Sequence, residues 1–341
     1  MSKRVIISVN ETDKNNAGPK AKTDIDKILK ENENFQVINL AFNWHSKFLK
    51  MRYISWDIPH LMRNMDADEI FFQFPSYSRT LMDSFVKNIR RYTKAKLIFI
   101  VHDLECLRNF SYDPTYKPEE LKWLKEADGI IVHNPSMAKW LKNNGVDTPM
   151  AILGFFDYLN PQPVNKDAKM DGSICFAGNL KKAGFLAKLP SSLSLDVFGP
   201  NFNPELKNKV NYKGVYSPDE LPKYLTEDFG LIWDGDSIDE CNGLFGNYLR
   251  YNCPHKASLY LSSGLPIIVW KKAAIAEYVE QYKLGYAIDS LSEIPVIIEN
   301  MTQADYDLIK GNALDMAQKL RHGEHIRGAI ESLSATLSSE K

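Results

Sequence analysis

The segment Asp228–Trp270, DFGLIWDGDSIDECNGLFGNYLRYNCPHKASLYLSSGLPIIVW, decides the fold of this chain. Its apolar runs, Phe229–Trp233 and Ile267–Trp270, predict two strands buried on both faces of a parallel sheet. Between them, Pro254 takes the place of a first helical residue and Gly264 the place of a helix end. The segment therefore predicts a strand, a long polar loop, a helix and a second buried strand.

The predicted helix begins with His255 and Lys256, beside a loop rich in Asp, Asn and Gly. Unpaired N–H groups and the positive end of the helix dipole attract anions, and a lysine adds a full charge. We interpret this as a diphosphate site, the end of a nucleotide-sugar site that holds the leaving group. Asn252, just before the helix, is placed in the same donor site.

Composition limits the possible functions. The 341 residues suit two domains, and 44% hydrophobic with 25% charged residues is typical of a soluble globular protein. A formal net charge of −1 gives no overall field for nucleic acid, which we therefore exclude as a partner. Four cysteines without a CxxC pair fit neither a disulfide framework nor a zinc site. With no signal peptide and no membrane-length apolar run, we expect a cytoplasmic protein.

Strand-like and helix-like segments alternate along the chain, which predicts parallel, doubly wound sheets. The apolar runs are 5–9, 35–40, 70–74, 97–101, 130–132 and 151–153, then 173–177, 195–198, 215–216, 229–233, 267–270 and 286–288. We predict an α/β protein of two Rossmann-like domains that face an interdomain cleft, because ligands of open sheets bind at the carboxyl ends of strands.

A linker is predicted at Leu159–Gly172, where two prolines interrupt a stretch without apolar periodicity. It separates an acceptor-binding domain, 1–160, from a nucleotide-sugar domain, 171–341, whose last helix is expected to cross back. The first strand is followed by NETDKNNAGPK rather than GxGxxG, so the NAD-binding fingerprint is missing. No P-loop, HExxH or GxSxG motif occurs either.

Three groups of polar or aromatic residues in the second half each have a functional and a structural interpretation, and the third group is the acidic pair described in the next paragraph. The turn Gly178-Asn179 with Lys181 and Lys182 can bring backbone and charge to a ligand, or be an ordinary turn before a basic helix. Tyr216 can stack on a base or pack in the core, and the following Ser217–Glu220 predicts a capped helix.

The pair Asp234 and Asp236 resembles the DxD motif that holds Mn²⁺ or Mg²⁺ on a nucleotide-sugar diphosphate in one class of glycosyltransferases. Loop capping is the alternative. Because the helix N-terminus can neutralise phosphate, we expect no metal and no cofactor.

Candidate catalytic and acceptor residues follow the strands of the first half. Asp103 or His102 can take the proton from an acceptor hydroxyl, with His133 after the next strand as a further candidate, although a capped helix start also explains such residues. The predicted acceptor-binding residues are Gly18, Trp44, Gln73 and Tyr77. The helix 81–92 and its exit are basic, which indicates either a solvated face or contact with anionic lipid.

These residues resemble a known family. FGLIWDGDS and FGNYLRYNCPHKASLYLSSGLPIIVW, with VHDLECLR, VHNPSM, FFDYL and FAGNL upstream, are similar to the bacterial β-1,6-galactofuranosyltransferases of O-antigen assembly. More distantly, the chain resembles the glucosyltransferases that extend N-acetylglucosamine on serine-rich adhesins. The resemblance covers nearly the whole chain and implies a GT-B fold, a UDP-sugar donor, metal independence and inversion.

The resemblance also implies residue roles. Lys256 matches a lysine that binds the diphosphate, Tyr216 a tyrosine that contacts the nucleoside, and Lys182 an arginine near the donor. A lysine cannot reproduce a bidentate guanidinium contact, so the last match departs from the family pattern. Retaining GT-B enzymes show Glu-x7-Glu before the SG-P turn, where this chain has Lys256 and Leu259, and inversion is thereby favoured.

The sequence thus predicts an inverting hexosyltransferase that moves a hexose from a UDP-sugar to a hydroxyl of a glycan, lipid-linked or glycoprotein acceptor. The resemblance implies galactofuranose first, and the sugar stays open because the relatives differ on furanose and pyranose donors. The alternatives are a UDP-glucose-dependent glucosyltransferase of glycosylated adhesins, a catalytically silent GT-B partner subunit, and a UDP-sugar epimerase. We further expect a homo-oligomer with peripheral contact to the inner face of the membrane.

Overall fold

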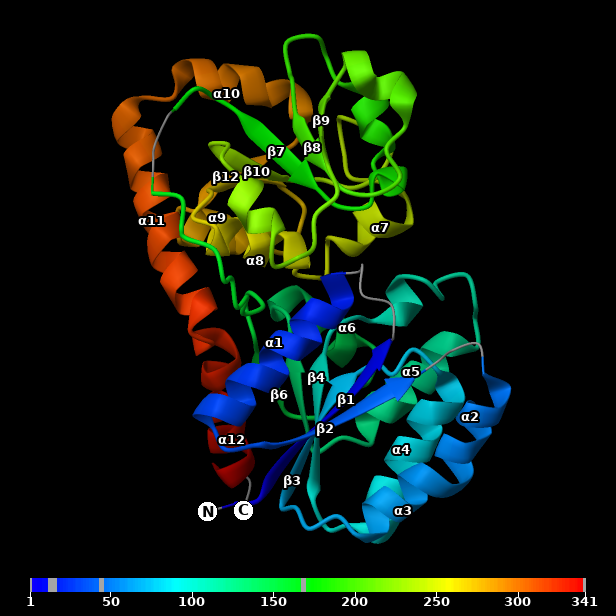
Figure 1. Ribbon diagram of the computed structural model, residues 1–341. Coiled ribbons are helices and arrows are strands. Elements are labelled where there is room, and N and C mark those ends of the chain that lie inside the picture. Colours follow the sequence, from blue (N-terminus) through cyan, green and yellow to red (C-terminus); the bar gives the residue numbers. More distant parts are fainter. Residues whose placement is uncertain (1, 12–16, 43–45, 167–169, 340–341) are drawn as a thin grey trace. The chain divides into compact units, whose positions relative to one another are not determined.

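The computed structural model describes residues 2–11, 17–42, 46–166 and 170–339 (Figure 1). Internal contacts divide the chain into two compact units, Met1–Leu153 with Ile326–Lys341, and Gly154–His325. Each unit contains a six-stranded parallel sheet with helices packed on it. The predicted α/β architecture with two Rossmann-like domains is confirmed.

The sheet of the first unit has the strand order β2-β1-β3-β4-β5-β6. Its strands are β1 (Arg4–Glu11), β2 (Gln36–Phe42), β3 (Glu69–Phe74), β4 (Lys96–Val101), β5 (Gly129–Val132) and β6 (Met150–Ile152). Its helices are α1 (Ala17–Asn32), α2 (Lys47–Arg52), the π-helix η1 (Tyr53–Asp57), α3 (Ile58–Arg63), α4 (Arg79–Tyr92), the 3₁₀ turn η2 (Glu105–Leu107), α5 (Tyr116–Lys125), α6 (Pro135–Asn143) and most of α12 (Glu324–Ser339). Strands β3, β4 and β5 are almost entirely buried, which explains their unbroken apolar runs.

The sheet of the second unit has the order β12-β11-β10-β7-β8-β9. Its strands are β7 (Ile174–Ala177), β8 (Asp196–Phe198), β9 (Asn211–Gly214), β10 (Phe229–Ile232), β11 (Ile267–Trp270) and β12 (Gly285–Ile288). Its α-helices are α7 (Gly243–Tyr248), α8 (His255–Ser262), α9 (Ala276–Gln281), α10 (Ile294–Asn300) and α11 (Gln303–Arg321). Its 3₁₀ turns are η3 (Leu180–Lys182), η4 (Gly184–Lys188), η5 (Pro204–Asn208), η6 (Leu221–Tyr224) and η7 (Leu291–Glu293).

Strand order reverses at one point in each sheet. In the first unit the chain leaves β1 for β2 on one side and continues with β3 on the other. In the second unit β7 pairs with β8 on one side and β10 on the other. The loops that follow the two central strands diverge at such a point and leave a crevice for a ligand.

Local details differ from the sequence predictions. Helix α8 begins at His255, and Pro254 is its N-cap rather than its first residue. Ser217 does donate its hydroxyl to Glu220, at 2.8 Å, but only the 3₁₀ turn η6 follows. Pro222 explains this, because proline disfavours α-helical geometry in the residue before it. Helix α7, inside the long polar loop, was not predicted.

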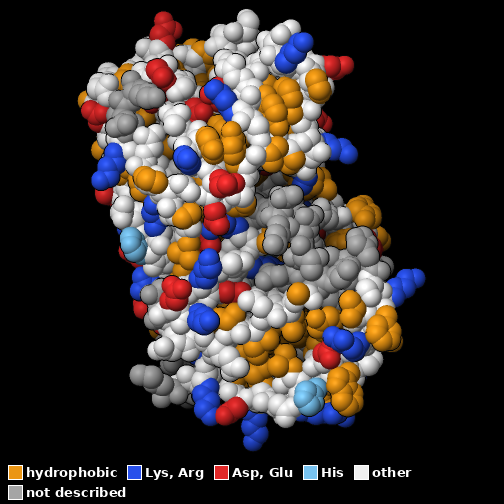
Figure 2. Space-filling model, in the orientation of Figure 1, with side chains coloured by type: hydrophobic (Ala, Val, Ile, Leu, Met, Phe, Trp, Pro, Cys, Tyr) orange, Lys and Arg blue, Asp and Glu red, His pale blue; other side chains and the backbone are white. Residues whose placement is uncertain are grey.

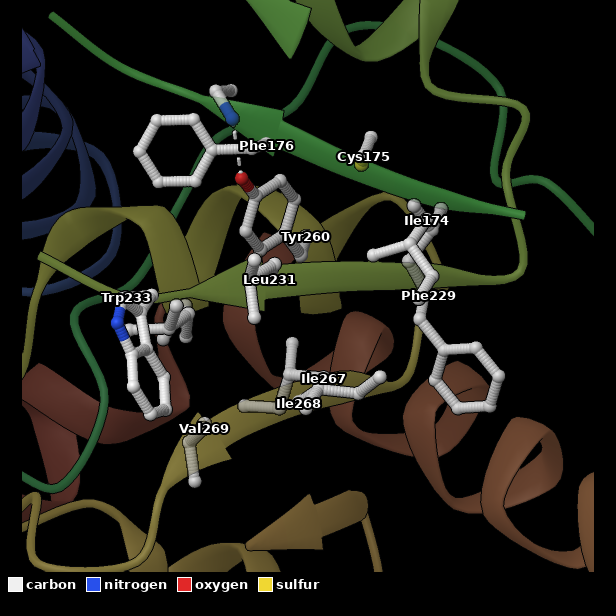
Figure 3. Close-up of a cluster of buried hydrophobic side chains, with 14 of the residues drawn as sticks. Ile174, Cys175, Phe176, Phe229, Leu231, Trp233, Tyr260, Ile267, Ile268 and Val269 are labelled. Atoms are coloured by element: carbon white, nitrogen blue, oxygen red, sulfur yellow. Dashed lines mark hydrogen bonds between the residues drawn. The ribbon is translucent and has the colours of Figure 1, made fainter. Parts of the chain in front are cut away.

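Helix α8 is fixed on its sheet by Tyr260, whose ring packs on Gly230. Figure 3 shows the Tyr260 ring between the strands that carry Phe176 and Leu231. A Cβ atom on Gly230, in β10, would lie 2.2 Å from Cγ of the Tyr260 ring, so only glycine leaves room for that ring. The Tyr260 hydroxyl accepts a hydrogen bond from the backbone N–H of Ala177, at 2.7 Å, at the end of β7. One side chain of α8 thus contacts both central strands of the second sheet.

The segment Leu159–Gly172, for which the sequence predicts a linker, lies within the second unit. Asn160 is buried, and its side chain donates to the Ser262 carbonyl at 3.3 Å. Arg321 donates to the carbonyls of Ser262, at 2.7 Å, and Gln162, at 2.8 Å. These bonds attach the beginning of the segment to α8 and α11.

Among the described residues, no helix combines the length and hydropathy that crossing a membrane requires.

Replacing Gly230 by alanine is expected to destabilise the second unit by about 1–3 kcal/mol, because the methyl group would overlap the buried Tyr260 ring. Chemical denaturation measures the free energy of unfolding. Gly311→Ala in α11 is the matched control, because a Cβ there meets no atom within 4 Å, and it should stabilise the protein slightly. Equal stability of the two variants would contradict this account of the packing.

Candidate active site

A largely buried lysine, Lys256, lies at the strand reversal between β7 and β10 in the second unit. The Lys256 ammonium donates to the carboxylate of Asp234, at 3.0 Å, and to the Trp233 carbonyl, at 3.4 Å. It also lies 4.6 Å from the centroid of the Phe176 ring. The side chains of Lys256 and Asp234 keep only 17% and 18% of their surface exposed. Lys256 is therefore held where the ends of β7 and β10 meet.

The loop after β10 is ordered by an asparagine. Gly235 has φ +114°, and a Cβ there would lie 2.5 Å from Oδ1 of Asn242, so the turn needs glycine. Oδ1 of Asn242 in turn accepts the backbone N–H of Asp236, at 2.8 Å. Asn242 thus caps this turn, while Asp234 pairs with Lys256. In the part of the chain that the structure describes, no three His, Cys, Asp or Glu side chains group as metal ligands.

The loop after β7 packs tightly on the end of β8. A Cβ on Gly199 would lie 1.8 Å from the carbonyl oxygen of Gly178, so glycine is required for this approach. Asn179 caps η3 by accepting the backbone N–H of Lys181, at 3.2 Å. The ammonium of Lys182 lies 3.7 Å from the centroid of the Phe245 ring, which belongs to α7.

Aromatic rings flank the predicted donor residues. Tyr216 follows β9 and stacks on Tyr224, with 3.9 Å between centroids and 24° between planes. Tyr224 was not predicted, because nothing in the sequence distinguishes it from a core tyrosine. His255 lies 5.1 Å from the Tyr158 ring. Oδ1 of Asn252 is buried and has no hydrogen-bond partner among the described residues.

In the first unit the predicted catalytic residues differ in exposure. Asp103 forms an ion pair with Arg108, at 2.5 Å, and accepts the Tyr77 hydroxyl, at 3.3 Å. His133 is buried and donates Nε2–H to the Val101 carbonyl, at 2.9 Å. Burial lowers the pKa of His133 to about 4, so the ring is neutral near pH 7. Arg108 was missed, although it follows Asp103 by only five residues.

Gln73 is fully buried and connects His102 to the interior of the unit. Its Oε1 lies 2.7 Å from Nε2 of His102. Because an amide oxygen only accepts, this ring nitrogen carries the proton, and Nδ1 is the acceptor atom of the neutral ring. The Gln73 amide donates to Ser8 Oγ, at 2.7 Å, and to Asp26 Oδ1, at 2.8 Å. The Gln73 side chain is thus hydrogen-bonded inside the unit and holds His102, while its predicted role in acceptor binding stays a prediction.

Of the predicted acceptor residues not yet placed, the structure describes one. Gly18 is in the first turn of α1, and Trp44 lies outside the described residues. The ammonium of Lys22, also in α1, donates to the carbonyls of Val9 and Pro75, each at 3.2 Å, and lies 4.9 Å from the Tyr77 ring. Lys22 thus bonds the end of β1 to the loop after β3.

Comparison with known proteins finds relatives over nearly the whole chain. Residues 3–155 match the family described as "Glucosyltransferase 3-like, N-terminal domain", and residues 174–333 match its C-terminal domain. The chain is 30% identical to the β-1,6-galactofuranosyltransferase WbbI of Escherichia coli K12 over 322 residues, 93% of this chain and 94% of the relative. It is 26% identical to glucosyltransferase 3 of Streptococcus gordonii, over 88% and 87% of the two chains. The resemblance inferred from the sequence is confirmed.

Solved structures agree on the fold. Sucrose-phosphate synthase from Thermosynechococcus elongatus superposes with a TM-score of 0.67 at 12% identity, covering 99% of this chain and 100% of the other. An Escherichia coli trehalose-6-phosphate enzyme bound with UDP-2-fluoro glucose gives 0.59 at 12% identity, over 97% and 99%. These likenesses identify the fold as GT-B.

The Asp26→Asn variant is expected to change how stability depends on pH. Burial raises the pKa of Asp26 to about 6, above its ordinary 3.8, despite hydrogen bonds from Ser8 and Gln73. The folded state therefore holds this proton more tightly than the unfolded chain, and the stability it provides below pH 3.8 is lost as the pH rises through 6.

Relative to the variant, the free energy of unfolding of the wild type should fall by about 3 kcal/mol between these limits. Denaturant titrations at a series of pH values measure it. Asp147→Asn, at an exposed position, controls for the loss of one negative charge. Parallel profiles for wild type and Asp26→Asn would show that Asp26 does not titrate in this range.

Proposed function

This chain belongs to the glucosyltransferase 3-like family and is a glycosyltransferase, and on that premise we propose that it transfers a hexose from a UDP-sugar to a hydroxyl of a glycan acceptor. The observation that carries the proposal is the position of Lys256 at the reversal between β7 and β10. Galactofuranose is the sugar we propose, because the 30% identical relative is a galactofuranosyltransferase.

The donor diphosphate is proposed to bind at Lys256. An ammonium has three protons, and two of those on Lys256 are used by Asp234 and Trp233. The third is available for a phosphate oxygen, and the positive end of the α8 dipole attracts the same anion. These positive groups stabilise the charge that develops on the departing UDP, so the proposed transfer needs no divalent metal.

The nucleoside and the sugar are assigned to groups around this centre. The ring pair Tyr216 and Tyr224 offers a flat aromatic surface on which uracil can stack. The buried Oδ1 of Asn252, without a partner among the described residues, is suited to accept a sugar hydroxyl. Asn179, Lys181, Lys182 and His255 complete the proposed donor-binding set.

In the first unit we assign the acceptor and the base. Asp103 is proposed to remove the proton from the acceptor hydroxyl, while Tyr77 and Arg108 hold its carboxylate. The acceptor oxygen then attacks the anomeric carbon, the bond from that carbon to the phosphate oxygen breaks, and UDP leaves with the electron pair. One displacement inverts the anomeric configuration. His102 is the second candidate base, because Gln73 fixes its tautomer.

Lys256→Met should weaken UDP binding by about 10- to 100-fold, because it removes a charge-assisted hydrogen bond to phosphate. Isothermal titration calorimetry with UDP in EDTA measures this. Lys271→Met is the matched control, since Lys271 pairs with Asp289 at 3.3 Å after the neighbouring strand β11. Asp234→Asn should not weaken binding if Asp234 only holds Lys256. Binding that requires Mn²⁺ or Mg²⁺ and disappears in Asp234→Asn would replace this proposal with a metal site.

Asp103→Asn should lower kcat by about 10²- to 10⁴-fold without changing the affinity for UDP, because the amide cannot accept the proton. UDP release is measured with UDP-galactofuranose, UDP-galactose, UDP-glucose and UDP-N-acetylglucosamine and a panel of alkyl glycosides. His133→Gln is the comparison variant, and its kcat should stay within about tenfold of wild type. An active Asp103→Asn with an inactive His102→Gln would transfer the role to His102. UDP binding without turnover by the wild type would indicate a silent subunit.

A further inference from the structure

Helices α2 and η1 leave large apolar side chains in water. Neither element contains a buried residue. Phe48, Met51 and Trp56 expose 77%, 61% and 68% of their surface. A helix of a soluble protein is ordinarily stabilised by burying its apolar side chains against the core. Here the apolar side chains lie on the solvent side, which is typical of a surface that binds a partner.

This surface is fixed to the first unit by its other side. Ser46 caps α2 by accepting the backbone N–H of Leu49, at 3.2 Å. The Tyr53 hydroxyl donates to the Ala41 carbonyl, at 2.9 Å. Ile58 and Met62, in the following helix α3, are buried. The exposed side chains therefore belong to an anchored helical segment and not to a frayed end of the chain.

Basic residues outnumber acidic ones on α2, α3 and α4. Residues 47–63 contain four Lys or Arg and one acid, Asp57, which pairs with Arg52 at 2.9 Å. Helix α4 packs beside α3, where Arg63 donates to the Tyr92 hydroxyl at 2.8 Å. Lys87, Arg91 and Lys94 are exposed on α4 and its exit. The whole chain has a net charge of −1, so this positive surface is a local concentration. Figure 2 shows hydrophobic and basic side chains interspersed over α2 and α3.

We propose that α2, η1 and α3, with the adjoining face of α4, dock on an anionic membrane. Phe48, Met51 and Trp56 enter the boundary between headgroups and acyl chains, while the lysines and arginines pair with lipid phosphates. A second copy of the chain is a poorer partner, because a two-fold contact through this face would bring two sets of cations together. Nucleic acid would neutralise the cations but leave the apolar side chains in water.

Docking in this way does not depend on the donor or on the reaction proposed above. It would hold the first unit, to which we assign the acceptor, against the surface where lipid-linked acceptors are found. The membrane surface and the candidate active site share no residue, so substitutions on one can be tested without altering the other.

Co-sedimentation of the full chain with vesicles tests the proposal. Wild type should bind vesicles that contain phosphatidylglycerol and not pure phosphatidylcholine vesicles, and added salt should weaken the binding. Phe48→Ser with Trp56→Ser should weaken binding by about tenfold or more, as should Lys47→Glu with Lys50→Glu. Brominated acyl chains should quench tryptophan fluorescence in wild type and quench it less in Trp56→Phe.

Matched controls separate docking from general effects. Tyr112→Ser removes an aromatic side chain that is also 77% exposed in the same unit, and it should bind as wild type does. Lys27→Glu with Lys30→Glu makes the same change of net charge on α1. Circular dichroism shows whether each variant folds. The proposal would be overturned if the variants of the docking surface bound vesicles as well as the control variants do. A wild-type oligomer that ignores vesicles and becomes monomeric in Phe48→Ser with Trp56→Ser would also overturn it.

Discussion

The second unit depends on the packing of the Tyr260 ring on Gly230. Because no side chain intervenes, helix α8 approaches β10 closely enough for the Tyr260 hydroxyl to bond the Ala177 N–H at the end of β7. Lys256 lies one helical turn before Tyr260, on the same face of α8. The contact that fixes the helix therefore also fixes the cation, which reaches the ends of the two strands at which the chain order reverses.

The first unit solves a similar problem with buried polar groups. Ser8, Asp26 and Gln73 come from β1, α1 and β3, and their side chains bond to one another in the interior. Such a network specifies one arrangement, because each group would be costly to bury alone. Lys22 adds bonds to Val9, in β1, and to Pro75, after β3. Polar side chains thus connect the central strands of the first sheet, while an aromatic ring connects those of the second.

Features that depend on neighbours in the sequence were predictable. The buried strands β10 and β11 are unbroken apolar runs, and the end of α8 and the position of Lys256 follow from proline and glycine nearby. Features that depend on contacts between distant segments were not. Gln73 is 47 residues from Asp26, and nothing local shows that its amide is used in the interior. The same applies to Tyr224, whose proposed role depends on its stacking on Tyr216, eight residues away and in another turn.

The acid beside the proposed phosphate lysine has a physical explanation. A lysine with 17% of its side chain exposed has lost most of its hydration, and Asp234 offsets that cost while no ligand is bound. A diphosphate brings further negative charge, which one ammonium already shared with a carboxylate cannot balance. The N-terminus of α8 supplies the additional positive potential without a side chain that would need its own partner. A pair that is stable alone and a helix end that favours anions together suit a site that must bind UDP and release it after transfer.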